Sequence, residues 1–317
     1  MKESPFIYNV VAENDKFYGR DEIIREILGY TAKNNDFGNV WLLGQNQVGK
    51  TSILKRIQRY NSQNIQISNN RTVKFIYIDC QYFFPKDDFL NYFARQVNYT
   101  LSLGVAESES DFFTSVFNQV YLHNIYIVYL FDEFDSIFNH IDDFDIKLSM
   151  NIMKTVRSII NGIQHLPNQP KLIGAVFSSR KIYGDVTNGF KNIGSPLNFL
   201  KIDIPWFGIE DIQLLVEHYG CANIFTKNDY LFCFRLSKGH PKLVQKTLEL
   251  IYFNKKHMHN ILTEKQISNE LLIYSKSSIN EIEDLNIPKE IIDSFSSLGI
   301  KLKINLLVTS LEFEAKK

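Results

Sequence analysis

Several features are scarce in this chain of 317 residues, and each scarcity excludes a class of protein. There are three cysteines, Cys80, Cys221 and Cys233, an odd number whose spacing fits neither a disulfide framework nor a zinc site. No stretch approaches about 18 consecutive apolar residues, so no membrane-spanning segment is expected. The N-terminal residues lack the apolar core of a signal peptide. We therefore expect a cytoplasmic protein with reduced thiols.

No charge of either sign dominates the composition. Lys and Arg together number 35, and Asp and Glu also number 35, so the net charge is zero. A dedicated nucleic-acid binder usually carries a basic excess, and the composition therefore argues against that class, although a local basic face stays open. Apolar residues make up 44% and charged residues 22%, as in a globular protein with a sizeable core. At about 100–200 residues per domain, the length indicates two or three domains.

Short apolar runs predict the strands of a parallel sheet. They are continuous and rich in β-branched or aromatic residues, which is typical of strands buried on both faces. The runs are 40–43, 73–78, 125–131, 172–177 and 199–204. Apolar residues at helical spacing predict helices between them at 52–60, 88–97 and 146–163. This alternation indicates βαβ units, and the polar, Asn-rich stretch 61–70 indicates a loop.

The pattern becomes helical from Pro205 onward. Helices are predicted at 209–219, 227–237 and 241–253, the last beginning at a proline, as suits a first helical turn. Beyond them lie helical patterns at 264–274 and 288–296 and an apolar run at 302–308 that would form a strand. We predict an α/β domain over 1–205, a small helical domain over 206–255, and a short C-terminal α/β or helical tail over 256–317.

A phosphate-binding loop follows the first predicted strand. The signature G-x-x-x-x-G-K-[ST] occurs between a strand and a helix, the context that supports it. It reads Gly44, Gln45, Asn46, Gln47, Val48, Gly49, Lys50, Thr51. The glycines let successive N–H groups point at phosphates, and the helix N-terminus adds partial positive charge. We assign these residues and Ser52 to binding of ATP, with Lys50 on the β- and γ-phosphates and Thr51 on Mg²⁺.

Two acidic residues follow the third predicted strand. Asp132 is placed to hold Mg²⁺, and Glu133 is placed to orient or deprotonate the attacking water. An acidic turn that caps the next helix is the plainer interpretation, but the phosphate loop favours catalysis. Glu133 and Lys50 are therefore the candidate catalytic residues, with Thr51 and Asp132 as metal ligands. Asp135 is interpreted as a turn or N-cap residue.

The order of these motifs resembles the AAA+ and STAND nucleotide switches, two groups of P-loop ATPases, over about residues 14–255. Four features support the resemblance besides the phosphate loop. They are the box Phe17-Tyr18-Gly19-Arg20-Asp21, the pair Asp132-Glu133, the strand end Ser178-Ser179-Arg180 and the lid motif Gly239-His240-Pro241. The phrase Ser195-Pro196-Leu197-Asn198 is also similar to archaeal and bacterial STAND-like ATPases. The resemblance implies a P-loop NTPase core of strand order 5-1-4-3-2 and a helical lid that closes over the nucleotide.

The resemblance also assigns residues outside the loop. Tyr18, Arg20, Ser178 and Pro241 are expected to contact the nucleotide. The alternatives are a surface arginine beside a turn for Arg20 and a helix N-cap for Ser178 and its neighbour Ser179.

Three further residues have two interpretations each. Arg180 is either an arginine finger for a neighbouring subunit or a solvated arginine. Arg157 is an inter-subunit arginine or, more simply, a solvent-facing helical residue. His240 either reaches the phosphates or caps the helix that Pro241 begins.

The predicted function is an ATP-hydrolysing switch that couples nucleotide state to assembly or to a protein partner, with ATP and Mg²⁺ as cofactors. The resemblance suggests an effector in trans, a homo-oligomer on nucleotide binding, and a defence or mobile-element setting. STAND proteins usually carry effector and sensor domains, and about 60 residues follow the lid here. We therefore expect those parts to be separate chains, or the protein to be a simpler AAA-like ATPase.

Two alternatives stay open. One is a DNA-associated initiator or loader, whose tail would bind DNA through scattered basic residues. These are Lys255, Lys256, His257, Lys301 and Lys303. The other is a nucleotide-stabilised scaffold with little turnover, against which Glu133 argues.

Overall fold

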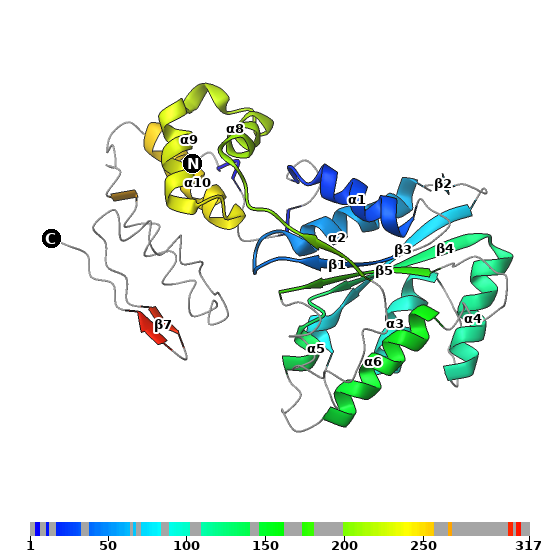
Figure 1. Cartoon of the computed structure of the whole chain (residues 1–317). Helices are drawn as coiled ribbons and strands as arrows, with labels where there is room; N and C mark the ends of the chain where they lie inside the picture. Colours follow the sequence, from blue (N-terminus) through cyan, green and yellow to red (C-terminus); the bar gives the residue numbers. More distant parts are fainter. Residues whose placement is uncertain are drawn as a thin grey trace. The chain divides into compact units, whose positions relative to one another are not determined.

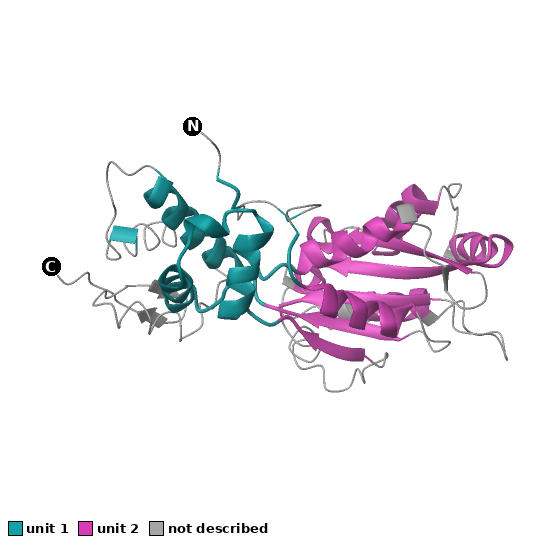
Figure 2. Cartoon of the chain, turned by 90° about the horizontal axis from the view of Figure 1, so that it is seen from above, with its two compact units in different colours: residues 1–19, 45–49, 205–317 teal, residues 20–44, 50–204 magenta. Residues whose placement is uncertain are grey.

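The computed structural model of the chain describes most residues up to 256 and a few beyond. The described residues are 4–6, 11–12, 17–32, 38–63, 66–67, 71–83, 89–101, 109–139, 146–161, 173–180, 199–256, 266–267, 304–306 and 309–311. Contacts divide the chain into two compact units, shown in Figure 2. One, here called the sheet unit, comprises residues 20–44 and 50–204, and the other, the helical unit, comprises 1–19, 45–49 and 205–317. The division into three domains stays a prediction.

Parallel strands form the centre of the sheet unit. They are β1 (Asn39–Leu43), β3 (Arg71–Asp79), β4 (Ile125–Asp132), β5 (Ile173–Ser179) and β6 (Phe199–Asp203). Their order is β3-β4-β5-β1-β6, with every pairing parallel. Numbered among themselves and read from the β6 edge, the strands follow the order 5-1-4-3-2, which confirms the predicted fold class.

The predicted loop 61–70 is wrong in part, because it contains regular structure. The 3-10 helix η2 (Arg59–Gln63) and the short strand β2 (Gln66–Ile67) lie within it or overlap it. β2 pairs antiparallel with β3 at the edge of the sheet. Backbone groups alone make this pairing, so a polar, Asn-rich composition did not prevent it.

The core of the sheet unit is built from apolar runs on the central strands. β4 and β5 are buried along their whole lengths, as expected for parallel strands covered on both faces. The rings of Phe131 and Phe177 stack at 4.8 Å between adjacent strands, and Phe134 contacts Phe177 edge-on at the same distance. Both strands extend beyond the apolar runs to polar residues, Asp132 on β4 and Ser179 on β5. Backbone pairing with the neighbouring strands continues at these residues, although their side chains are polar.

Helices cover both faces of this sheet. They are α1 (Asp21–Thr31), α2 (Lys50–Gln58), α3 (Phe89–Leu101), α4 (Glu109–Leu122), α5 (Ser136–Asn139) and α6 (Ile146–Asn161), with the 3-10 helix η3 (Cys80–Tyr82). Figure 1 shows α1 and α2 on one face, and α3, α4 and α6 on the other. The sequence patterns predict neither α1 nor α4.

The helical unit contains α8 (Ile209–His218), η4 (Ala222–Ile224), α9 (Lys227–Ser237) and α10 (Pro241–Lys256). Its core includes Leu236, Val244 and Leu248, all fully buried. Phe6, from the start of the chain, joins this core and contacts the ring of Tyr219 edge-on at 5.4 Å. The three predicted helices are thus present, within a few residues of their predicted ends.

Glycine is required at the turn between α9 and α10. Gly239 has a φ of +87°, and a Cβ at this position would lie 2.0 Å from the carbonyl oxygen of Phe207. No other residue fits such a close approach without displacing the backbone. The Phe207 amide also donates to the Gly239 carbonyl at 2.9 Å, which ties this turn to the segment before α8.

Little of the C-terminal tail is described. The strands β7 (Ile304–Leu306) and β8 (Thr309–Leu311) pair antiparallel, so the run predicted as one strand at 302–308 contributes only the first strand of a pair. Gln266 and Ile267 are helical, inside the predicted helix 264–274, whereas 288–296 lies outside the described residues. No helix in the described part of the chain is both long and apolar enough to cross a membrane. All three cysteines are buried and free.

Candidate functional site

The loop 44–49 connects the end of β1 to the start of α2. Gln47 and Gly49 have φ values of 61° and 104°, in the region that favours glycine. The amide of Gly44 donates to the carbonyl of Ser179 on β5 at 3.1 Å and fixes the start of the loop. A loop of this kind followed by a helix N-terminus presents backbone N–H groups to an anion. Thr51 and Ser52 occupy the first turn of α2, half-buried.

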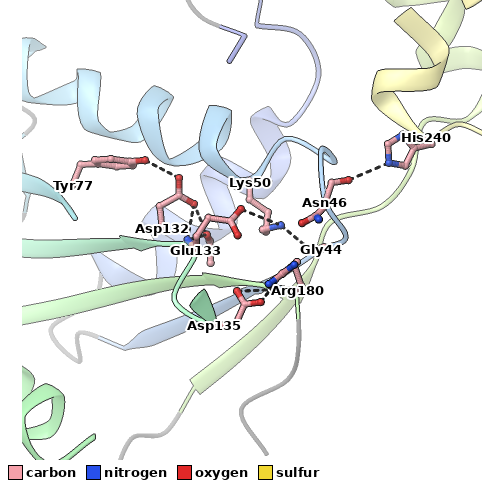
Figure 3. A network of polar contacts seen from close by, with 10 residues as sticks. Gly44, Asn46, Lys50, Tyr77, Asp132, Glu133, Asp135, Arg180 and His240 are labelled. Atoms are coloured by element: carbon pink, nitrogen blue, oxygen red, sulfur yellow. Dashed lines mark hydrogen bonds and ion pairs between the residues drawn. The ribbon is translucent and has the colours of Figure 1, made fainter. Parts of the chain in front are cut away.

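Lys50 is the first residue of α2 and is only 3% exposed. Its Nζ donates to the carbonyl of Gly44 at 3.0 Å and lies 3.9 Å from Oε1 of Glu133, as Figure 3 shows. Burial lowers the pKa of Lys50, and the nearby Glu133 carboxylate opposes that shift. A buried ammonium gains stability from an added anion, so the site favours a negatively charged ligand.

Asp132 ends β4 and is held from both flanking strands. Its Oδ1 accepts a hydrogen bond from the Ser178 hydroxyl on β5 at 2.5 Å, and its Oδ2 accepts one from the Tyr77 hydroxyl on β3 at 2.7 Å. Burial, and then the Asp132 carboxylate, raise the pKa of Tyr77. The arrangement follows from parallel strand order, because neighbouring strands end at the same edge of the sheet. Nucleotide contact by Ser178 itself stays a prediction.

Glu133 has an unusual backbone conformation, with a φ of 49°. Such a conformation costs about 1–3 kcal/mol for a residue other than glycine. Its amide donates to Oδ1 of Asp132 and to Oγ of Ser178, both at 3.1 Å, and these bonds hold the turn. The Glu133 side chain points toward Lys50. Burial raises the pKa of Glu133, while Lys50 acts in the opposite direction.

Asp135 and Arg180 form an ion pair that the sequence analysis did not foresee. The Nε of Arg180 lies 2.7 Å from Oδ2 of Asp135, with side chains 17% and 1% exposed. The sequence predicts Asp135 to be a turn or N-cap residue, and it does lie in the turn before α5. It predicts Arg180 to be a finger in trans or a solvated arginine. Asp135 follows β4 and Arg180 follows β5. The predicted strand order makes these strands neighbours, so it could have indicated that the two residues lie close together.

His240 contacts the phosphate loop, whose residues 45–49 group with the helical unit. Its Nε2 lies 3.1 Å from the carbonyl oxygen of Asn46 (Figure 3). Pro241 follows as the buried first residue of α10. His240 thus meets the loop backbone, a contact that neither interpretation of it named.

The structure gives each of the remaining candidates a position of its own. The ring of Tyr18 is 5.4 Å from that of His218 in the helical unit. Arg20 immediately precedes α1 in the sheet unit with a φ of 136°. Arg157 is exposed on α6, and Lys255 forms an ion pair with Asp229. His257, Lys301 and Lys303 lie outside the described residues. The nucleotide contacts expected of Tyr18, Arg20 and Pro241 stay predictions.

The sequence matches the family described as an AAA-like domain over residues 9–301. The chain belongs to this AAA-like family. The resemblance to AAA+-type P-loop ATPases, stated from the motifs, is thereby confirmed. No curated protein shows significant similarity to this AAA-like chain.

Solved structures share the fold of the AAA-like chain at low sequence identity. The Walker-type ATPase PABY2304 of Pyrococcus abyssi is 12% identical with a TM-score of 0.60, and the match covers 96% of this chain and 91% of that one. The ORC2 protein of Aeropyrum pernix, in ADPNP and ADP complexes, is 14% identical with a TM-score of 0.56, and the coverages are 89% and 74%. The ORC1 protein of the same organism, in complex with DNA, is 14% identical with a TM-score of 0.51, and the coverages are 86% and 70%.

Proposed function

We propose that this AAA-like chain binds ATP in the loop 44–51 and hydrolyses its terminal phosphoanhydride bond. One observation carries the proposal: the buried Lys50 ammonium lies 3.9 Å from the Glu133 carboxylate, beside a phosphate-type loop. A cation for phosphate and a base for water thus meet at one edge of the sheet. Hydrolysis needs these two groups together, whereas binding alone needs only the first.

The loop and α2 would hold the nucleotide. Backbone N–H groups of 44–49 and the N-terminus of α2 would bind the phosphates, and Lys50 would neutralise the β- and γ-phosphates. The structurally similar ORC2 protein was solved in ADPNP and ADP complexes, which supports a nucleotide as the ligand. The added negative charge would stabilise the Lys50 ammonium, which burial otherwise disfavours.

The donor set also fits Mg²⁺ of the kind that accompanies ATP. No group of three or more His, Cys, Asp or Glu side chains that could hold a metal occurs among the described residues. Mg²⁺ at nucleotide sites is held by one or two protein oxygens, waters and substrate phosphates, so such a group is not needed. The Thr51 hydroxyl and the Asp132 carboxylate would supply the protein oxygens, and bound Mg²⁺ would neutralise charge on the phosphates.

Glu133 would act on the attacking water. Its carboxylate accepts a proton from water as the water oxygen bonds to the γ-phosphorus. The bond from that phosphorus to the β–γ bridging oxygen breaks, and its electron pair leaves with ADP. Burial raises the pKa of Glu133, which strengthens the carboxylate as a base near neutral pH.

The nucleotide state would then act as a switch, because ATP can shift a conformation only if it binds one state more tightly. The helical unit would respond to the nucleotide, since residues 45–49 of the phosphate loop belong to this unit. We propose that the readout is a protein partner in trans or self-assembly, as in STAND-type switches. A DNA-associated loader is the second candidate, supported by the DNA complex of the similar ORC1 protein and opposed by zero net charge.

Nucleotide binding and phosphate release of the wild type and of Lys50→Ala test this proposal. Lys50→Ala removes a charged contact and should weaken ATP binding by about 10-fold to 100-fold. Lys154→Ala, which removes an exposed lysine of α6, is the matched control and should bind normally. A wild type that binds no ATP would refute the proposal. Size measurements with ATP and with DNA separate the two readouts: assembly on ATP favours the switch, and turnover stimulated several-fold by DNA favours the loader.

A further inference from the structure

We propose that His240 is a positioning residue for the phosphate loop. Its imidazole would hold the Asn46 carbonyl, orient the next backbone N–H toward the phosphates, and thereby slow nucleotide release. The inference rests on the proposed ATP binding, and it adds a residue of the helical unit to the control of the bound nucleotide. The contact that carries it is the 3.1 Å separation between Nε2 of His240 and the carbonyl oxygen of Asn46.

The chemistry of the contact fixes the protonation of the ring. A carbonyl oxygen only accepts hydrogen bonds, so Nε2 must carry the hydrogen. In the neutral ring Nδ1 is then bare, and within the described part of the chain this buried atom has no hydrogen-bond partner. His240 is 4% exposed, and burial lowers its pKa to about 4. The ring is therefore a neutral Nε2–H donor at physiological pH.

Holding the Asn46 carbonyl also orients the amide of Gln47. The two groups belong to one trans peptide, whose C=O and N–H point in opposite directions. A hydrogen bond that turns the carbonyl toward His240 therefore turns the Gln47 N–H away from it. This N–H lies in the middle of the phosphate loop, where such groups bind phosphate oxygens.

The loop needs such a restraint because of its backbone conformation. Gln47 has a φ of 61°, which is unfavourable for a residue with a side chain. Within the loop, the Val48 amide approaches the carbonyl of Gln45 at 3.4 Å, a long hydrogen bond. The His240 contact is shorter, and it reaches the peptide that precedes the strained residue.

His240 is itself held firmly by the turn that carries it. Its amide donates to the carbonyl of Ser237 at 2.9 Å, and its own carbonyl accepts from Val244 in the first turn of α10 at 2.8 Å. The ring of Trp206 lies 5.6 Å away, nearly perpendicular to the imidazole. The preceding Gly239 permits the tight approach to Phe207 described above. The imidazole therefore has little freedom to move independently of the turn between α9 and α10.

Three substitutions separate the hydrogen bond from the bulk of the side chain. His240→Gln places an amide N–H donor at about the position of Nε2. His240→Asn keeps an amide but is too short to reach, and His240→Met fills similar volume without a donor. Release of a fluorescent ADP analogue from the full-length chain in the presence of Mg²⁺ would be measured by stopped flow. Loss of one hydrogen bond should speed release about 5-fold to 10-fold in the Asn and Met substitutions, and His240→Gln should stay near the wild-type rate.

The outcomes distinguish this inference from the function on which it rests. If the wild type binds the ADP analogue but His240→Asn and His240→Met release it at the wild-type rate, the inference is wrong and nucleotide binding stands. The inference is also wrong if His240→Gln releases as fast as His240→Met. If the wild type binds neither the analogue nor ATP, the proposed function fails first. Thermal unfolding of each variant identifies any that does not fold, and the remaining donor-deleted variant then decides.

Discussion

The phenolic hydroxyl of Tyr77 donates a hydrogen bond to Oδ2 of Asp132 across two neighbouring strands, at 2.7 Å. The other carboxylate oxygen accepts from Ser178, so Asp132 is oriented from both sides. The Lys55 ammonium lies 3.3 Å from the centroid of the Tyr77 ring, a cation–π contact that restrains the phenol. Tyr77 is therefore a positioning residue for the proposed metal-binding carboxylate.

Tyr77→Phe removes only this hydroxyl, and the carboxylate should become less well oriented. We expect the Mg²⁺ concentration for half-maximal ATP hydrolysis to rise roughly 3-fold to 10-fold, the equivalent of one hydrogen bond. Binding of ATP without Mg²⁺ should be unchanged. Tyr129→Phe, which removes a buried hydroxyl from the same strand as Asp132, is the control. An unchanged Mg²⁺ dependence in Tyr77→Phe would remove Tyr77 from the site.

The ion pair between Asp135 and Arg180 should stabilise the sheet unit. Asp135→Asn leaves a largely buried guanidinium without its counter-charge, and we expect a loss of about 2–3 kcal/mol, below the range for fully buried pairs because Arg180 is partly exposed. Urea unfolding of both single variants and of Asp135→Asn with Arg180→Gln gives the coupling energy. A coupling near zero would contradict a stabilising ion pair between these two residues.

His240 should make the stability of the chain depend on pH. Its pKa is lowered to about 4 in the folded protein, against about 6.5 when unfolded. Between these values the unfolded state binds a proton that the folded state does not, so the contribution is full above pH 6.5 and falls as the pH drops. From pH 7 to pH 5, the wild type should lose about 2 kcal/mol more unfolding free energy than His240→Gln. Parallel losses in the two proteins would mean that His240 is solvated.

Glu133 should set the acid limit of ATP hydrolysis, because only the ionised carboxylate can accept a proton from water. Burial raises its pKa, so the rate should decline at a pH above the ordinary glutamate value of about 4.3. Single-turnover rates measured from about pH 4 to pH 8 would show this limb. An acid limb at or below the ordinary glutamate value of about 4.3 would argue against Glu133 as the base.

Much of the sheet unit could be predicted because local patterns and topology agree. The continuous apolar runs around Phe131 and Phe177 predict buried parallel strands. The phosphate loop before Lys50 supports the first predicted strand, 40–43, because this motif connects a strand to a helix. The edge strand β2 could not be predicted in this way, because it is only two residues long, lies in a polar, Asn-rich stretch, and depends on β3 for its pairing.

The site could be predicted only where a motif specifies both residue and spacing. Lys50 and Glu133 follow from such motifs, and the structure brings them within 3.9 Å. The roles of Tyr77 and Asp135 depend on which strands are neighbours and on where each side chain points. His240 and Asn46 are 194 residues apart in the sequence, and no local sequence pattern predicts their contact.

The most direct test of the central claim is single-turnover ATP hydrolysis by the wild type and by Glu133→Gln, with Glu22→Gln on the exposed surface of α1 as the control. Glu133→Gln keeps the size and hydrogen-bonding shape of the side chain but cannot accept the proton. We expect it to bind ATP normally and to hydrolyse it roughly 100-fold to 10,000-fold more slowly, while Glu22→Gln stays at the wild-type rate. Equal hydrolysis by Glu133→Gln and the wild type would contradict the assignment of Glu133 as the base.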